Sequence, residues 1–446
     1  MKIKNICCIG AGYVGGPTMA VIALKCPELN VSVVDSNKDK IKSWNGALDD
    51  LPVYEPGLPE IIKKTRNKNL FFRTDIRNCI EESEMIFMAV NTPTKKTGKG
   101  AGMATDLRYV KKCAKLIAKY SKTDKIVIEK STLPVRTAEK IKEILSKESN
   151  NLHFEVLSNP EFLAEGTAIQ DLFKSDRVLI GCEPTKSGQI AADKLVEIYE
   201  KWIPPTKIIR SNIWSSELSK LASNAMLAQR ISSINSLSAL CKETGADIDE
   251  VSLSVGLDHR IGSHFLKVSP GFGGSCFKKD ILSLVYLCKY YGLDIVAEYW
   301  YSIIRINNYQ RSRIVEILKN FISQEKLKKE ISLLGWAFKK NTNDSRESSS
   351  IYVTSYLLNM DYKINIYDPM VSKDRIELDL LDVGVKKHII KKKLIIHNSL
   401  DQVIKKNLPI GIMTEWDEFK TLEKKNNLKI FDFRNFIDSQ KTFFRF

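Results

Sequence analysis

The sequence predicts an α/β protein with two doubly wound parallel sheets, joined by a long central helix and a helical middle domain. Apolar strand-like segments alternate with helical segments over residues 1–212, a strand-free stretch covers 214–243, and the alternation resumes at Ile331. We therefore expect three domains, at residues 1–212, 213–325 and 326–446.

The chain begins with an apolar strand at 3–9, a glycine loop, a helix, and a second strand at 31–34 that ends in Asp35. The loop residues are Gly10, Ala11, Gly12, Tyr13, Val14 and Gly15. Glycines at this spacing let the backbone approach a pyrophosphate, which the helix amides then bind. An acid after the second strand hydrogen-bonds the ribose and repels a 2′-phosphate. This context predicts a Rossmann-like domain that binds NAD rather than NADP; a glycine turn without a ligand is the alternative.

Three later strands, at 85–90, 125–129 and 154–158, each run into a polar loop that contains proline. In open α/β sheets ligands bind at the carboxyl ends of the strands, where these loops lie. Each proline alone is ordinary loop punctuation. Three such loops in one domain favour a binding site.

The stretch 214–243 predicts one long helix, closed by Gly245, whose small residues suit packing against another helix. Lys220 and Asn224 lie one turn apart on it and share a face. Such residues are solvated by default. If this face is instead buried at a domain junction, the two groups can stabilise an oxyanion.

Cys276 follows the glycine loop 271–274 and precedes a helix that carries Asp280 one turn later. A helix N-terminus favours the thiolate, so Cys276 is the best nucleophile candidate among the nine cysteines. Asp280 on the same face could orient a water or relay a proton. The alternative is an inert buried thiol beside an ordinary first-turn acid.

The C-terminal part has strand patterns at 331–334, 363–367, 410–413 and 429–431, and a helical pattern at 348–359. Its first turn, 335–338, lacks the dinucleotide glycines. A second α/β lobe that binds a nucleotide other than NAD is expected.

Composition indicates a globular protein, with 43% apolar and 27% charged residues. No stretch approaches the ~18 apolar residues of a membrane span, no signal peptide is evident, and the cysteines are scattered, so we expect a cytoplasmic protein with no membrane partner and no metal site. The net charge of +16 is spread in short lysine runs typical of a solvated surface. A nucleic-acid-binding protein is the alternative, and we expect no such partner.

These motifs, over nearly the whole chain, resemble those of the animal-type UDP-glucose 6-dehydrogenases in the UDP-glucose/GDP-mannose dehydrogenase family. The shared segments are 6–9, 91–94, 159–166, 214–234, the Cys276 loop, 337–340 and 346–350. The resemblance implies two NAD-dependent hydride transfers that convert UDP-glucose to UDP-glucuronate. It further implies a thiohemiacetal and a thioester on Cys276, a homo-oligomer built from dimers, and a hexamer as the final state.

The resemblance also implies residue roles. Glu161 and Thr132 are similar to residues that position water, while Lys220, Asn224 and Asp280 are similar to those that handle the oxyanion and protons. The implied cofactor contacts, beyond the glycine loop and Asp35, are Lys40, Val90, Asn91, Thr92, Pro93, Thr94, Ser131, Thr132, Glu165 and Arg346. The implied substrate contacts are Glu161, Phe162, Leu163, Ala164, Glu165, Lys220, Asn224, Lys267, Phe272, Gly273, Phe338, Lys339, Arg434 and, from a neighbouring subunit, Arg260.

The chain departs from the family at Phe433, where Asp-Gly-Arg is usual and Asp432-Phe433-Arg434 occurs. Two other functions stay open. A sister dehydrogenase acting on GDP-mannose or UDP-N-acetylmannosamine would use the same cysteine and lysine chemistry. A non-catalytic nucleotide-sugar binder would not need Cys276, Lys220, Asp280 and Glu161 together.

Overall fold

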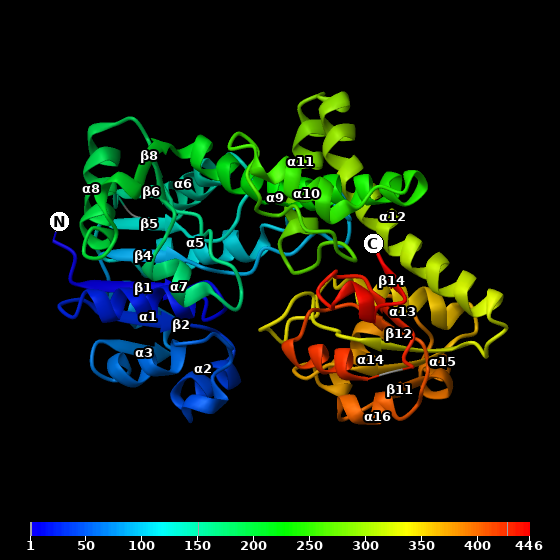
Figure 1. Cartoon of the computed structure of the whole chain (residues 1–446). Helices are drawn as coiled ribbons and strands as arrows, with labels where there is room; N and C mark the ends of the chain where they lie inside the picture. The colour runs from blue at the N-terminus through cyan, green and yellow to red at the C-terminus, as the bar shows by residue number, and fades with distance from the viewer. Residues whose placement is uncertain (1, 150, 426) are drawn as a thin grey trace. The chain divides into compact units, whose positions relative to one another are not determined.

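The computed structural model describes residues 2–149, 151–425 and 427–446. The chain divides into two compact units, Met1–Ser223 and Asn224–Phe446, and each contains a sheet with helices packed around it (Figure 1). The predicted fold class is confirmed.

The first unit is built on an eight-stranded sheet in the order β3-β2-β1-β4-β5-β6-β7-β8. The strands are β1 (Asn5–Ile9), β2 (Asn30–Val34), β3 (Leu70–Arg73), β4 (Met85–Met88), β5 (Lys125–Glu129), β6 (Phe154–Ser158), β7 (Val178–Cys182) and β8 (Ile208–Asn212). β6 pairs antiparallel with β7, so the last two strands run opposite to the other six. The first six strands have the order of a dinucleotide-binding sheet, whose direction of winding reverses between β1 and β4.

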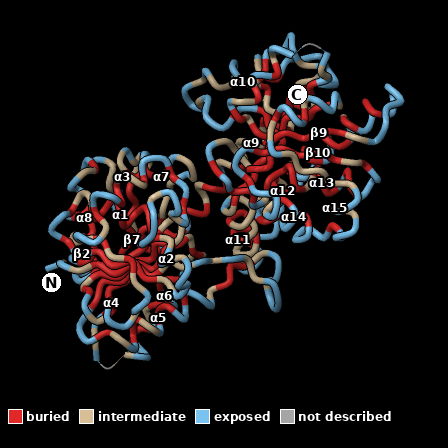
Figure 2. Tube along the Cα trace, turned by 90° about the horizontal axis from the view of Figure 1, so that it is seen from below, coloured by how far each residue is buried: buried red, intermediate tan, exposed pale blue. Residues whose placement is uncertain are grey.

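Helices pack against this sheet and bury its central strands. They are α1 (Gly15–Lys25), α2 (Lys38–Asn45), α3 (Leu58–Thr65), α4 (Ile76–Glu82), α5 (Arg108–Tyr120), α6 (Thr137–Glu148), α7 (Ala168–Phe173) and α8 (Lys186–Tyr199), with short 3-10 turns η1 (Leu48–Asp50) and η2 (Pro205–Lys207). All residues of β5, β6 and β7 are buried, and Figure 2 shows the strands as the buried centre of the unit. Burial on both faces explains the apolar runs at 126–128 in β5 and 178–182 in β7.

Helix α9 (Ile213–Thr244) begins in the first unit and continues into the second. The other helices of the second unit are α10 (Ile248–Leu257), α11 (Phe277–Tyr290), α12 (Asp294–Gln324), α13 (Ser349–Asn359), α14 (Lys373–Asp382), α15 (Lys387–Lys393) and α16 (Leu400–Ile404), with 3-10 turns η3 (Asp417–Lys424) and η4 (Ser439–Lys441). Its strands are β9 (Glu330–Leu334), β10 (Lys363–Tyr367), β11 (Leu394–Ile396), β12 (Ile410–Ile412), β13 (Ile430–Asp432) and β14 (Phe444–Arg445). They form a parallel sheet in the order β11-β10-β9-β12-β13-β14.

Phe433, the departure from the family pattern, lies just after β13 and is fully buried. Its ring lies 5.9 Å from that of Phe444 and 5.3 Å from that of Phe446, measured between centroids. The left-handed residue of this turn is Asn435, with φ of 47°, whereas the backbone of Phe433 is not left-handed. A phenylalanine is therefore accommodated here without backbone strain, and its ring adds to the core of the unit.

Candidate active site

The glycine loop packs closely against the ends of β1 and β4. Gly10 has φ of +116°, and a Cβ on it would lie 2.2 Å from the carbonyl oxygen of Ala89. A Cβ on Gly15 would lie 2.0 Å from the carbonyl oxygen of Gly10, so α1 can begin here only without a side chain. Gly12 instead faces open space, with nothing within 4 Å of the Cβ position. The first and third glycines are required by packing, and the middle one leaves room for a phosphate.

Asp35 lies beside this loop at the end of β2. Its carboxylate accepts the N–H of Ala11 at 3.1 Å and the N–H of Asn37 at 2.9 Å, and forms an ion pair with Lys40 at 3.0 Å. Burial opposes ionisation, but these donors together lower the pKa of Asp35. The ionised group is an acceptor suited to a ribose hydroxyl. The glycine loop and Asp35 thus fit NAD.

The loops after β4 and β5 are joined by a hydrogen bond, since the Ser131 hydroxyl donates to the carbonyl of Val90 at 2.7 Å. Thr94 forms a bridge with Thr105 and anchors the other end of the first loop. The remaining predicted contact residues lie along these two loops with at least partly exposed side chains: Asn91, Thr92, Pro93 and Thr132. The structure therefore places these residues beside the glycine loop, where the sheet reverses its winding.

A buried ion pair joins the loops after β5 and β6. The ammonium of Lys130 lies 2.8 Å from a carboxylate oxygen of Glu161, and it also contacts Asn159 at 3.1 Å and the Tyr199 hydroxyl at 3.3 Å. Burial lowers the pKa of Lys130 and raises that of Glu161, but the mutual attraction outweighs burial, so the pKa of Lys130 is raised and that of Glu161 lowered. Glu161 is thus held ionised. Sequence reasoning missed Lys130, although its place directly after β5 was a signal.

Lys220, on the first turns of α9, is 7% exposed. Its ammonium lies 5.1 Å from the ring centroid of Phe162, and Arg177 covers the same ring at 3.8 Å. The charge of Lys220 also contributes to the lowered pKa of Glu161, after Lys130 and the Phe162 N–H. The structure therefore brings together Glu161, Phe162 and Lys220. The next residues, Leu163, Ala164 and Glu165, continue the same loop, with Leu163 packed on the core and Ala164 exposed.

In the second unit, Cys276 is the N-cap residue of α11 and is exposed. The other eight cysteines, all within the described ranges, are free and buried. Burial raises the pKa of the Cys8 thiol to about 12 and that of Cys26 to about 11, which makes them poor nucleophiles. Cys276 is the accessible thiol of the nine.

Asp280 is fully buried one turn after Cys276, and its N–H donates to the Cys276 carbonyl at 2.9 Å. One carboxylate oxygen accepts the Asn224 amide at 2.6 Å, and the other lies 2.8 Å from Lys279. Burial opposes the charge of Lys279, but Asp280 and Cys276 raise its pKa. The predicted residues Asn224, Asp280 and Cys276 therefore lie together with a cation, Lys279, that sequence reasoning missed.

The loop before Cys276 is fixed by buried polar side chains. Phe272 donates its N–H to Asn307 at 2.8 Å, and its carbonyl accepts from Asn307 and Arg311 at 3.1 and 3.2 Å. The Gly274 N–H donates to the Arg346 carbonyl at 2.8 Å. A Cβ on Gly273 would lie 2.7 Å from that of Phe338.

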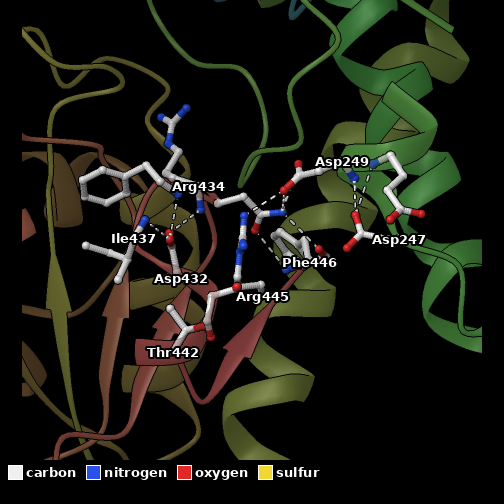
Figure 3. Close-up of polar contacts among 12 residues, drawn as sticks. Asp247, Asp249, Asp432, Arg434, Ile437, Thr442, Arg445 and Phe446 are labelled. Atoms are coloured by element: carbon white, nitrogen blue, oxygen red, sulfur yellow. Dashed lines mark hydrogen bonds and ion pairs between the residues drawn. The ribbon is translucent and has the colours of Figure 1, made fainter. Parts of the chain in front are cut away.

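Arg434 completes this group from the end of β13. Its guanidinium donates to the carbonyls of Met413 and Phe338, each at 2.9 Å, and lies 3.0 Å from Glu415. Figure 3 shows Asp432 accepting the N–H groups of Arg434 and Ile437, which shapes this turn.

The remaining predicted residues of the second unit are more exposed. Lys339 lies 5.6 Å from the Phe338 ring centroid, and Arg346 is paired with Asp344 at 2.6 Å. Lys267 is exposed, and Arg260 is exposed and paired with Asp258 at 2.6 Å.

The strand order, the glycine loop and Asp35 are typical of an NAD-binding domain, and comparison with known proteins identifies the family. The chain matches the NAD binding domain of the UDP-glucose/GDP-mannose dehydrogenase family over residues 4–203, the central domain over 214–309 and the UDP binding domain over 332–439. The chain belongs to this family and is an NAD-dependent dehydrogenase, as predicted.

Several relatives are similar over nearly their full length. The chain is 51% identical to UDP-glucose 6-dehydrogenase 1 of Glycine max and 51% identical to UDP-glucose 6-dehydrogenase of Drosophila melanogaster, in each case over 98% of this chain and 94% of the relative. Among solved structures, a UDP-glucose dehydrogenase from Pyrobaculum islandicum has a TM-score of 0.85 and 28% identity, covering 100% of this chain and 97% of that one.

Residues 2–149, 151–425 and 427–446 contain no group of three His, Cys, Asp or Glu side chains arranged to hold a metal ion. Across those same ranges, no helix has both the length and the apolar character needed to cross a membrane.

We expect Asp35→Asn to weaken NAD binding and to reduce discrimination against NADP. A hydrogen bond to a charged group contributes about 1.5–3 kcal/mol, which corresponds to roughly 10- to 100-fold in the dissociation constant. Titration calorimetry with both cofactors measures the effect. Asp39→Asn, at an exposed position on α2, is the matched control. Unchanged NAD affinity in Asp35→Asn would contradict the assignment.

Proposed function

We propose that this chain oxidises the C6 alcohol of UDP-glucose to the carboxylate of UDP-glucuronate in two steps at one site. The observation that carries the proposal is the exposed thiol of Cys276 at the start of α11, beside Asp280, Asn224 and Lys279. The names of the relatives, 51% identical over 98% of the chain, support UDP-glucose as the substrate.

In the proposed mechanism, bound NAD accepts one hydride in each of the two oxidations. Cys276 adds as a thiolate to the aldehyde that the first oxidation leaves at C6, and forms a thiohemiacetal. The second oxidation converts this adduct to a thioester. Water then attacks the thioester carbon, the C–S bond breaks, and the thiol leaves the carboxylate product. Two NAD are reduced and one water is consumed for each sugar.

The chain's polar groups have distinct proposed roles in these steps. Lys220, with Asn224 and Asp280, stabilises the oxyanion and moves protons at the C6 oxygen. Ionised Glu161, with Thr132, positions the water. The glycine loop, Asp35, Lys40, the loops 90–94 and 131–132, Glu165 and Arg346 hold the cofactor.

The sugar nucleotide is held, in this proposal, mainly by residues of the C-terminal part. These are Lys267, Phe272, Gly273, Phe338, Lys339 and Arg434, together with residues 161–165, Lys220 and Asn224 of the chain, and Arg260 of a neighbouring subunit.

We retain the three-domain division at 1–212, 213–325 and 326–446, and we place the protein in the cytoplasm, where its nine free thiols persist.

We also propose a hexamer built from dimers through α9. Apolar side chains are exposed on this helix, and Met226 and Leu240 are each 60% exposed. Multi-angle light scattering measures the assembly directly, and an active monomer would contradict this proposal.

The nearest alternative remains a sister dehydrogenase that acts on GDP-mannose or UDP-N-acetylmannosamine. Turnover of UDP-glucose, GDP-mannose and UDP-N-acetylmannosamine at equal concentrations, with NAD in excess, decides between them. We expect UDP-glucose to react with the largest kcat/KM and to yield two NADH per sugar. A yield of one, or a preference for another sugar, would contradict the proposed function.

We expect Cys276→Ala to bind substrate and NAD but to lose efficient uronate formation, because no thiol then captures the aldehyde. Quantifying UDP-glucuronate by chromatography measures the loss. Cys288→Ala, which changes a buried thiol on the same helix α11, is the matched control and should keep turnover. Near-normal uronate production by folded Cys276→Ala protein would rule out the covalent mechanism.

A further inference from the structure

Two buried carboxyl groups meet in the first unit, outside the set of residues with proposed catalytic roles. Glu129 is the last residue of β5 and is 1% exposed, and Glu217 lies on α9 and is 3% exposed. Each carboxyl group affects the pKa of the other, so the two side chains lie close together. Two ionised carboxylates repel each other, and neither has a proton to donate. This close approach therefore requires that one of the two carboxyl groups is protonated.

Glu217 has the surroundings of an ionised carboxylate. One of its oxygens accepts the N–H of Arg136 at 2.7 Å, and the other accepts the N–H of Ala138 at 2.9 Å. These amides belong to the start of α6, and a helix N-terminus stabilises a negative charge. Glu217 therefore ties α9 to the beginning of α6.

Glu129 has the surroundings of a neutral acid. No N–H or O–H group among the described residues donates to either of its carboxyl oxygens. Burial raises the pKa of Glu129 well above its ordinary value and raises the pKa of Glu217 to about 6. The proton of the pair thus belongs on Glu129.

Three cationic side chains on the surrounding elements each contact another group. After β5, Lys130 is paired with Glu161 at 2.8 Å. At the start of α6, the Arg136 side chain is paired with Glu139 at 2.8 Å. On α9, Lys220 lies over the Phe162 ring. The donors that hold the Glu217 carboxylate are the α6 amides of Arg136 and Ala138.

We propose that Glu129 is a protonated carboxylic acid that donates to the Glu217 carboxylate, and that this pair positions α9, with Lys220, against the loop that carries Thr132. Thr132 follows Glu129 by three residues, and Lys220 follows Glu217 by three residues, about one turn further along α9. Glu129 and Glu217 are positioning residues that touch neither substrate nor cofactor. Their functional effect rests on the proposed role of Lys220.

Two substitutions separate the hydrogen bond from the packing. Glu129→Gln keeps a donor toward Glu217 but cannot titrate, and Glu129→Met keeps the length of the side chain without a donor. Glu139→Gln, on the outer side of α6, is the matched control.

Infrared spectroscopy of the full protein in D2O at neutral pH tests the protonation. We expect the absorption of a protonated carboxylic acid in wild type and in Glu139→Gln, and its loss in Glu129→Gln. Equal spectra for wild type and Glu129→Gln would overturn the proposal. This result does not depend on the reaction, so its failure is distinct from a failure of the proposed function.

Hydrogen exchange tests the pH dependence. Because the pKa of Glu129 is raised in the folded protein, its contribution to stability is fully present below the ordinary carboxyl pKa and is lost as the pH rises through the raised value. After correction for intrinsic exchange, the amides of Arg136 and Ala138 should lose protection in wild type, but not in Glu129→Gln, as the pH rises through that raised value. The same loss in both proteins would overturn the proposal.

Turnover tests the positioning. Since a displacement of about 1 Å can cost roughly 100-fold in rate, Glu129→Met should lower kcat by up to that factor with the KM for NAD unchanged, and Glu129→Gln should restore kcat. The positioning role would be overturned if folded Glu129→Gln lost as much kcat as Glu129→Met. It would also be overturned if Glu129→Met kept the kcat of wild type. If Glu129→Met does not fold, the infrared band, amide exchange and Glu129→Gln turnover still decide.

Discussion

The buried ion pair between Lys130 and Glu161 is the interaction on which the polar side of the first unit depends. It joins the loops that follow β5 and β6, and Asn159 and Tyr199 fix the ammonium from the other side. Removing one partner of a buried pair leaves an uncompensated charge and typically costs about 3–5 kcal/mol. Because Glu161 also accepts the Phe162 N–H at 2.9 Å, the pair fixes the ring that Lys220 and Arg177 cover. The position of Lys220 is therefore set from two sides, by this ring and by the turn of α9 that contains Glu217.

In the second unit, an accessible thiol follows a glycine-rich loop that must be held in one conformation. Glycine loses more conformational freedom on folding than any other residue, so such a loop needs fixed partners. Helix α12 supplies them: Asn307 and Arg311 bind the backbone of Phe272, and Gln310 donates to the Ser269 carbonyl at 2.9 Å. The backbone on either side of Cys276 is thus held by buried hydrogen bonds while its side chain stays exposed. This combination suits a nucleophile that must meet a carbon atom at a defined position.

Most of the fold could be predicted because its signals are local. Strands β1, β2, β4, β5 and β6 are apolar runs that end in glycine or polar loops, and α9 is a long strand-free stretch. In the first unit the prediction did not identify β3, which has four residues, the buried strand β7, or β8, whose side chains are largely exposed. The reversed direction of β7 and β8 depends on tertiary pairing, which the residue pattern alone does not specify.

The site was predictable where a local motif carries it and was missed where partners are distant in sequence. The glycine loop, Asp35 and the Cys276 helix each lie within one short segment. In the sequence, Lys130 and Glu217 are indistinguishable from ordinary charged residues. Only the fold brings Glu161 to Lys130 and the α6 amides to Glu217. Lys220 and Asn224 were open to a solvated interpretation, but their exposures of 7% and 5% show that both are buried.

At the end of β5, the neighbouring residues Glu129 and Lys130 interact with different carboxyl groups. Successive side chains of an extended chain point to opposite faces, so Glu129 and Lys130 leave the strand in different directions. Lys130 reaches Glu161 and Tyr199, where its charge keeps the Glu161 carboxylate ionised. Glu129 lies close to Glu217, and burial together with that carboxyl group raises the pKa of Glu129. Two glutamates near the same strand end thus acquire different protonation states, because one meets an ammonium group and the other meets a carboxylate.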